Sequence, residues 1–221
     1  MEALKIIVSG MIDGLTGFIP VSSSGHLLML KNVFGFGEGD SIIFDLCLKL
    51  ATIIVILFAF RKDVARIIRL ESGIYVKLAL MILAATVSTG IVGMGCRSFA
   101  VYAAKTVFFP GIFMILTGVM LFVTDGVKKG EVRISDAGFF EAVVIGGVQG
   151  LSVLPGLSRC GMVITTCLLL GFDRKLTWRF SFLCAVPSLI GAVILDIIEI
   201  ARFGVNDVGN TGWYISASVF A

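Results

Sequence analysis

Two apolar stretches of the chain are each interrupted by glycine, proline and a cluster of hydroxyl side chains. The first stretch covers residues 13–30 and the second covers residues 149–170. Peptide groups without a hydrogen-bond partner cost several kcal/mol each when they face lipid, so such a break is tolerated only inside protein or beside water. We therefore predict that the two breaks border one polar site inside a membrane protein.

The composition supports a membrane protein. Of the 221 residues, 57% are hydrophobic and 15% are charged, with a mean hydropathy of +1.04. So few charged residues do not provide the polar shell that a soluble protein needs. The fold class expected is an all-α polytopic membrane protein, with residues 1–221 forming a single integral membrane domain. A net charge of +3 without a basic, aromatic-rich patch argues against nucleic acid as a partner.

Charged segments between the apolar stretches predict the topology. The stretches long enough to cross a bilayer are residues 42–60, 76–95, 106–124 and 183–200. The segments rich in Lys and Arg, which the positive-inside rule places in the cytoplasm, are loops 61–71, 125–136 and 171–179. Residues 138–170 must then cross an even number of times, either as a helix with a re-entrant return or as two tight crossings.

The sequence gives three further expectations, which concern a turn, a pair of charged side chains and the last apolar run. A turn is predicted over residues 96–105, between two of the spans. Asp45 and Lys49 are four positions apart and are expected to pair with each other on one helix face. The final apolar run, residues 213–221, is too short to cross, so the last span is expected to be truncated.

The two breaks resemble each other. When residues 13–26 are laid over residues 149–162 without a gap, the identities are Gly14 with Gly150, Leu15 with Leu151, Ser22 with Ser158, and Gly25 with Gly161. The first break leads to a loop expected outside, whereas the second begins and ends inside. The pattern predicts an inverted-topology repeat, about 1–124 and about 137–221, whose two re-entrant or broken helix segments meet near the midplane.

A helix resumes after each break, which predicts an anion site. Ser22, Ser24 and Ser158 are placed as N-caps, so that free N–H groups and the positive ends of two helix dipoles converge. Arg159 adds a cation suited to bidentate phosphate contact, and an ion pair with Asp13 is its alternative role. A diphosphate carrying a lipid tail suits this arrangement.

The segments DGLTGFIPVSSSGHL (13–27) and PGLSRCGMV (155–163) resemble the two signature motifs of the undecaprenyl pyrophosphate phosphatase family, which is linked to bacitracin resistance. The resemblance extends over nearly the whole chain. It implies a bacterial plasma-membrane hydrolase whose site opens to the outer face. Such an enzyme converts undecaprenyl pyrophosphate to the monophosphate, the carrier lipid of cell-wall synthesis, with a divalent cation, Mg²⁺ or Ca²⁺. The partner implied is thus a polyprenyl pyrophosphate lipid.

The resemblance also assigns residues. It makes Ser23 the candidate nucleophile, His26 its base or acid, and Asp13 a metal ligand or base. The residues expected at the diphosphate, from the resemblance and from the anion-site argument together, are Arg159, Ser158, Ser22, Ser24 and Gln149. For Gln149 the alternative is a polar contact between helices.

Three positions depart from the family motifs. Where the first motif has two glutamates four residues apart, this chain has Asp13 and Gly17, so one carboxylate of a metal-binding pair is missing. In the second motif the family's serine is Cys160 and its threonine is Val163. Two alternatives to hydrolysis on the same scaffold therefore stay open, namely a non-hydrolytic polyprenyl-phosphate transporter or flippase, and an inactive relative.

Overall fold

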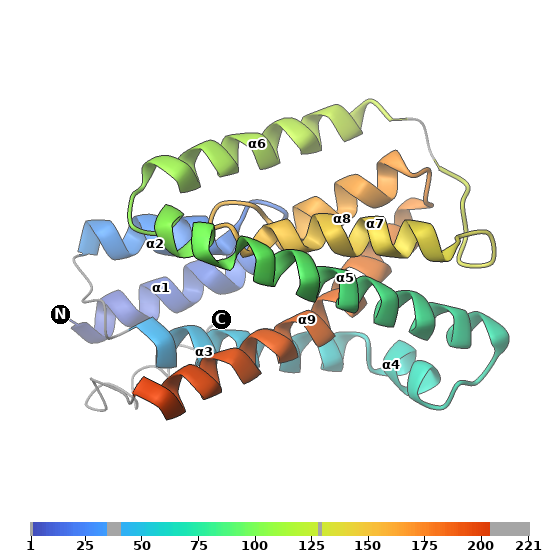
Figure 1. The fold of residues 1–221 in the computed structure, drawn as a ribbon, viewed down its shortest axis with the longest axis horizontal. Coiled ribbons are helices and arrows are strands. Elements are labelled where there is room, and N and C mark those ends of the chain that lie inside the picture. Colours follow the sequence, from blue (N-terminus) through green and yellow to red (C-terminus); the bar gives the residue numbers. More distant parts are fainter. Residues whose placement is uncertain (1, 35–40, 128–129, 204–221) are drawn as a thin grey trace.

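The computed structural model describes residues 2–34, 41–127 and 130–203, which form helices and loops with one isolated β-bridge and no strand (Figure 1). The all-α fold class is thereby confirmed for these residues. In chain order the helices are α1 Glu2–Gly17, α2 Ser23–Phe34, α3 Ser41–Ala59, α4 Arg61–Ile68, α5 Gly73–Ala103, α6 Phe108–Asp125, α7 Phe139–Gly150, the 3-10 turn η2 Leu151–Val153, α8 Arg159–Leu169 and α9 Arg174–Phe203.

Within the described residues, four helices are long and apolar enough to cross a membrane, namely α3, α5, α6 and α9. Large apolar side chains remain exposed along them, for example Phe122 at 82% and Ile91 at 69%, as lipid-facing side chains should. Helices α7 and α8, with 12 and 11 residues, extend only roughly 18 and 17 Å and are too short to cross a core of about 30 Å. The chain is a multi-pass membrane protein.

The short helices form two hairpins that approach each other. Helix α1 packs on α2, and α7 packs on α8. In Figure 1 the first hairpin enters from the end where the N-terminus lies and the second from the opposite end, with their turns near the middle. The turns are in contact, because the Cys160 Sγ lies 3.8 Å from the Gly17 carbonyl oxygen. The inverted-repeat relation and the midplane position stay predictions.

Two predicted boundaries are wrong. Helix α5 continues to Ala103, so the turn predicted over 96–105 is confined to 104–107, because no proline interrupts the segment before it. Helix α9 begins at Arg174, inside the segment predicted as a charged loop. The Asp173 carboxylate explains this start, since it accepts hydrogen bonds from the N–H groups of Lys175 at 3.0 Å and Leu176 at 3.2 Å, as an N-cap does.

The basic segments predicted as cytoplasmic gather at one end of the molecule. Arg179 at the start of α9 pairs with Asp63 of α4. The Lys77 Nζ at the start of α5 donates to the Ser135 carbonyl oxygen at 2.6 Å. Three connections predicted to share a side therefore lie together, while the identity of that side stays a prediction. The last predicted run, residues 213–221, lies outside the described residues.

The predicted pair between Asp45 and Lys49 is wrong. Asp45 instead lies 3.1 Å from the Nζ of Lys31 on α2, and the Lys49 Nζ lies 2.5 Å from Asp196 on α9. The long lysine side chains reach across helix interfaces, where a buried charge needs a partner most. Each ion pair links α3 to a neighbouring helix, the first to α2 and the second to α9.

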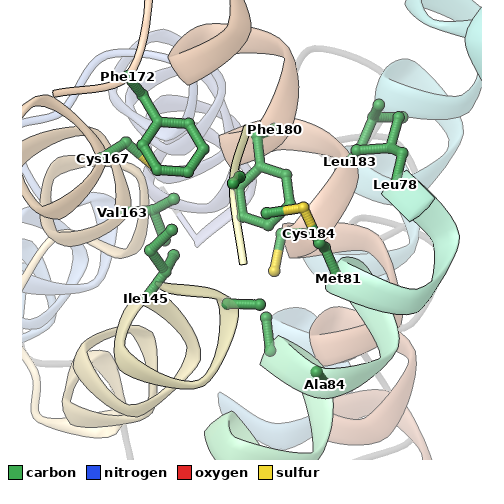
Figure 2. Packing of buried hydrophobic residues seen from close by; sticks show 13 residues of the cluster. Leu78, Met81, Ala84, Ile145, Val163, Cys167, Phe172, Phe180, Leu183 and Cys184 are labelled. Carbon is green, nitrogen blue, oxygen red and sulfur yellow. The ribbon is translucent and has the colours of Figure 1, made fainter. Parts of the chain in front are cut away.

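The largest buried cluster joins α5, α7, α8 and α9 (Figure 2). Its members are Leu78, Met81, Ala84, Ala85, Ala137, Ala142, Ile145, Val163, Cys167, Phe172, Phe180, Leu183 and Cys184. Helices α5 and α7 approach most closely, since an ideal Cβ on Gly146 would lie 2.1 Å from the Ala85 carbonyl oxygen. Glycine lets two backbones pack this closely where hydrophobic burial alone drives little association.

The substitution Gly146→Ala is expected to lower the thermal stability of the detergent-solubilised protein. Alanine favours a helix by about 1 kcal/mol over glycine, but overpacking costs roughly 1–3 kcal/mol, and a methyl group against a fixed backbone oxygen lies at the upper end. The control is Gly90→Ala on α5, where a Cβ meets nothing within 4 Å. Thermal unfolding by circular dichroism compares them, and an unchanged Tm for Gly146→Ala contradicts the packing described.

Candidate functional site

Helices α2 and α8 begin in the same way. The Ser22 Oγ accepts a hydrogen bond from the Gly25 N–H at 3.3 Å, and the Ser158 Oγ accepts one from the Gly161 N–H at 3.1 Å. Each serine thus satisfies one of the N–H groups that a helix start leaves without a partner. The two pairs that the alignment matched therefore make the same capping hydrogen bond, although Ser22 has a φ of +67° and Ser158 has a φ of −72°. The N–H groups left over at both starts remain for a ligand.

Asp13, Ser23 and Arg159 border the same space between the two turns. Asp13 is 8% exposed on α1, and its carboxylate interacts with the Ser23 side chain. Arg159, the first residue of α8, interacts electrostatically with Asp13. Among the described residues, however, Arg159 takes part in no salt bridge within 4 Å. The alternative ion pair with Asp13 is therefore not formed, and the guanidinium is available to an anion.

His26 points one ring nitrogen back at the turn. Its Nδ1 lies 2.8 Å from the Ser22 carbonyl oxygen. Because a carbonyl oxygen only accepts, Nδ1 carries the hydrogen, and Nε2 of the neutral ring is left with its lone pair. Ser23 and His26 are three positions apart on α2, a spacing that makes side chains neighbours on one helix face. Ser24 is wrongly predicted as an N-cap, because it lies inside α2; its side chain is exposed and its Oγ lies 3.3 Å from the Ser22 Oγ.

Gln149 is buried at the end of α7. Its Nε2 donates to the Ser188 Oγ at 2.8 Å and to the Cys184 carbonyl oxygen at 3.4 Å, both on α9. These contacts match the alternative in which Gln149 links helices. Its Oε1 has no partner among the described residues. A role at the diphosphate stays a prediction.

The three departures from the family motifs lie in two different places. Gly17 and Cys160 touch each other at the meeting point of the turns. An ideal Cβ on Gly17 would meet nothing within 4 Å, so the space for a side chain there is open. Val163, only 1% exposed, instead packs in the apolar cluster of Figure 2 beside Ile145 and Cys167. An apolar side chain suits that position, which belongs to the core.

The carboxylates of the site fit a cation only in part. Among the described residues, no group of three or more His, Cys, Asp or Glu is placed to hold a metal ion. Asp13 lies at the site. Asp45, whose charge acts on Asp13, is paired with Lys31. Mg²⁺ commonly binds through one or two carboxylates together with phosphate oxygens of a substrate. Asp13 therefore suits a Mg²⁺ ion that arrives with a diphosphate, and suits Ca²⁺, with its 6–8 oxygen ligands, less well.

Sequence reasoning missed Thr117 on α6. It is 2% exposed, and its Oγ1 accepts a hydrogen bond from the Ser158 N–H at 3.2 Å. The available signal was a hydroxyl in an apolar helix, which does not reveal which neighbour the hydroxyl meets. The second turn of the site is therefore held by a helix that carries none of the motif residues.

Comparisons with known proteins identify one family. A family model described as Bacitracin resistance protein BacA matches residues 6–221. A protein of Carboxydothermus hydrogenoformans named undecaprenyl-diphosphatase is 34% identical, over 95% of this chain and 78% of that protein. One of the same name from Desulfosudis oleivorans is 37% identical, over 90% and 79%. Another, from Methanosphaera stadtmanae, is 30% identical, over 100% and 86%.

Removal of the cap in Ser158→Ala is expected to cost about 1 kcal/mol of stability, which corresponds to a fall in Tm of about 2–4 °C. Ser158→Asn should retain most of the stability because asparagine also caps helices. Ser24→Ala, at an exposed hydroxyl, serves as the control. If Ser158→Ala and Ser24→Ala have the same Tm in a thermal scan, the Ser158 cap does not stabilise the protein as described.

Proposed function

Because the chain belongs to the bacitracin resistance protein (BacA) family, we propose that it hydrolyses undecaprenyl diphosphate to undecaprenyl phosphate and phosphate. The observation that carries the proposal is the meeting of two serine-capped helix starts beside Arg159 and the buried Asp13. The relatives reported above are named for hydrolysis and not for transport, which favours the enzyme over the transporter hypothesis. The product is the carrier lipid that cell-wall synthesis reuses.

The proposal places the protein in the bacterial plasma membrane with the site open to the outer face. The positive-inside rule supports this orientation, because the basic connections gather at one end and the first hairpin enters from the other. The polyprenyl tail then lies in the bilayer while the diphosphate enters between the turns. The exposed apolar faces of the long helices suit such a lipid substrate.

Binding of the diphosphate follows from the charges of the site. The free N–H groups at the starts of α2 and α8 point toward an anion, and the helix dipoles favour negative charge there. Arg159 donates two parallel hydrogen bonds to the terminal phosphate, a geometry that lysine does not reproduce. The hydroxyls of Ser22, Ser24 and Ser158 border the same space.

Hydrolysis then proceeds in two displacements. The Ser23 Oγ attacks the terminal phosphorus, the bond to the bridging oxygen breaks, and undecaprenyl phosphate leaves. The proton of Ser23 passes to the His26 Nε2, whose lone pair is available because Nδ1 binds the Ser22 carbonyl oxygen. His26 gives this proton to the departing undecaprenyl phosphate. Water next attacks the phosphoserine, His26 takes a proton from the water and returns one to the Ser23 Oγ as the bond between phosphorus and Oγ breaks, and phosphate departs with Ser23 restored.

Asp13 has two tasks in this scheme. Its negative charge, close to the Ser23 side chain, stabilises the imidazolium that forms when His26 takes the Ser23 proton, and it is the residue that would hold a divalent cation. A cation bound there neutralises charge that develops on the phosphate oxygens. Since Gly17 supplies no second carboxylate, the remaining ligands would come from the substrate and water.

The purified protein, given undecaprenyl diphosphate and Mg²⁺ in detergent, is expected to release one phosphate per lipid. Arg159→Ala should lower kcat/KM by about 100-fold or more, as loss of a transition-state donor does, and Arg159→Lys should restore only part of it. Arg133→Ala, at an exposed arginine of the basic end, should keep the original rate. Binding of the lipid without phosphate release by the unmodified protein would overturn the assignment.

The substitution Gly17→Glu is expected to increase the Mg²⁺-dependent rate several-fold. The new carboxylate lies one helical turn after Asp13, on the same face, in a position where a Cβ meets nothing within 4 Å. Gly17→Gln has the same size without the charge and is the matched control. Phosphate release is measured across Mg²⁺ concentrations, and equal rates for Glu and Gln would show that a second carboxylate brings no gain.

A further inference from the structure

Helix α6 contacts the turns of both hairpins. It packs on α2 and on α8, and Figure 1 shows it running along the side of the molecule where these helices lie. An ideal Cβ on Gly156 would lie 2.4 Å from the Pro110 carbonyl oxygen, and one on Gly25 would lie 2.7 Å from the Met114 Sδ. The second turn therefore lies against the backbone of α6 with no room for an added methyl group, whereas the first turn meets the end of the flexible Met114 side chain. A shift of α6 is expected to move the start of α8 more directly than the start of α2.

Thr117 joins α6 to the second turn by hydrogen bonds. Its Oγ1 accepts from the Ser158 N–H at 3.2 Å, and its hydroxyl hydrogen lies within reach of the carbonyl oxygens of Gly156 at 3.2 Å and Phe113 at 3.0 Å. The turn needs such an external partner. Gly156 has a φ of +105°, so its neighbouring peptide groups lie outside any regular helix.

The Thr117 side chain lies close to the first turn of α8. Its Cγ2 would lie 3.1 Å from an ideal Cβ on Gly161, whose N–H group is capped by Ser158. The direct contact of Thr117 with the start of α8 is the hydrogen bond that its Oγ1 accepts from the Ser158 N–H. Arg159 follows Ser158 in the chain, so this hydrogen bond limits the movement of its backbone.

We propose that Thr117 is a positioning residue for the diphosphate, because it sets the place of Ser158 and through it the direction of Arg159. The inference rests on the proposed hydrolysis and deepens it by giving α6 a part in the site. Valine has nearly the shape of threonine but no hydroxyl. In Thr117→Val the Ser158 N–H and the Gly156 carbonyl oxygen lose a buried partner, and the turn relaxes. Misplacement of catalytic groups by about 1 Å costs on the order of 100-fold in rate.

The same helix offers a matched control. Thr124 is 3% exposed, and the hydrogen bond that its hydroxyl makes goes to its own helix, to the Leu121 carbonyl oxygen at 2.8 Å. Thr117→Val is expected to lower kcat/KM by about 10–100-fold and to weaken competitive inhibition by inorganic pyrophosphate. Thr117→Ser should restore both quantities because it keeps the hydroxyl, and Thr124→Val should leave both unchanged. Thermal unfolding checks that all variants are folded.

Three results would overturn the positioning role. They are an unchanged rate and pyrophosphate inhibition in Thr117→Val, a loss that Thr117→Ser does not restore, and an equal loss in Thr124→Val. If Thr117→Val is not recovered folded, Thr117→Cys takes its place, because a thiol is a weak donor and acceptor. Should the unmodified protein release no phosphate, the proposed hydrolysis fails, and direct binding of pyrophosphate to the same variants decides the role of Thr117 by itself.

Discussion

A break in a membrane helix leaves peptide groups that lipid does not satisfy, and this protein satisfies them by bringing two breaks together. Ser22 and Ser158 each cap the helix that follows, and Thr117 binds the second turn from α6. The Cys160 thiol reaches the Gly17 carbonyl oxygen across the contact between the turns. The N–H groups that no internal partner takes lie at the starts of α2 and α8, where the two turns meet. The anion site is thus a consequence of how the breaks are satisfied.

Both hairpins are held by apolar packing, but in different clusters. The α7–α8 hairpin is embedded in the large apolar cluster and packed on α5 through Gly146, where backbones meet directly. The α1–α2 hairpin packs on α3 through a smaller buried cluster, which consists of Ile6, Leu27, Phe44 and Leu48. The ion pair between Lys31 and Asp45 adds a polar link between α2 and α3. Arg159 and the pair Ser23 and His26 are therefore carried by hairpins with separate apolar supports.

The sequence alone predicts the features that depend on neighbours in the chain. The interrupted apolar runs, the capping serines and the long spans follow from local pattern, and the structure agrees on the helices and on both caps. The pairing of Asp45 and Lys49 was predicted from spacing and is wrong, because side chains of this length pair across helices. Thr117 was missed for the same reason. Its partners are about forty residues away in the chain, and no local pattern encodes that contact.

The departure at Gly17 changes the charge of the site, whereas the cysteine at position 160 replaces one neutral side chain by another. With one carboxylate, Asp13, and one guanidinium, Arg159, the fixed charges nearest the turns cancel. A second carboxylate at position 17 would leave the site negative and make a divalent cation necessary before a diphosphate could enter. Without it, Arg159 offsets Asp13 and the helix starts attract the anion, so a cation is needed mainly to offset charge on the substrate itself. Arg159 and the helix starts act on the bound diphosphate and on the transition state alike. They therefore strengthen binding of the diphosphate more than they accelerate the chemical step.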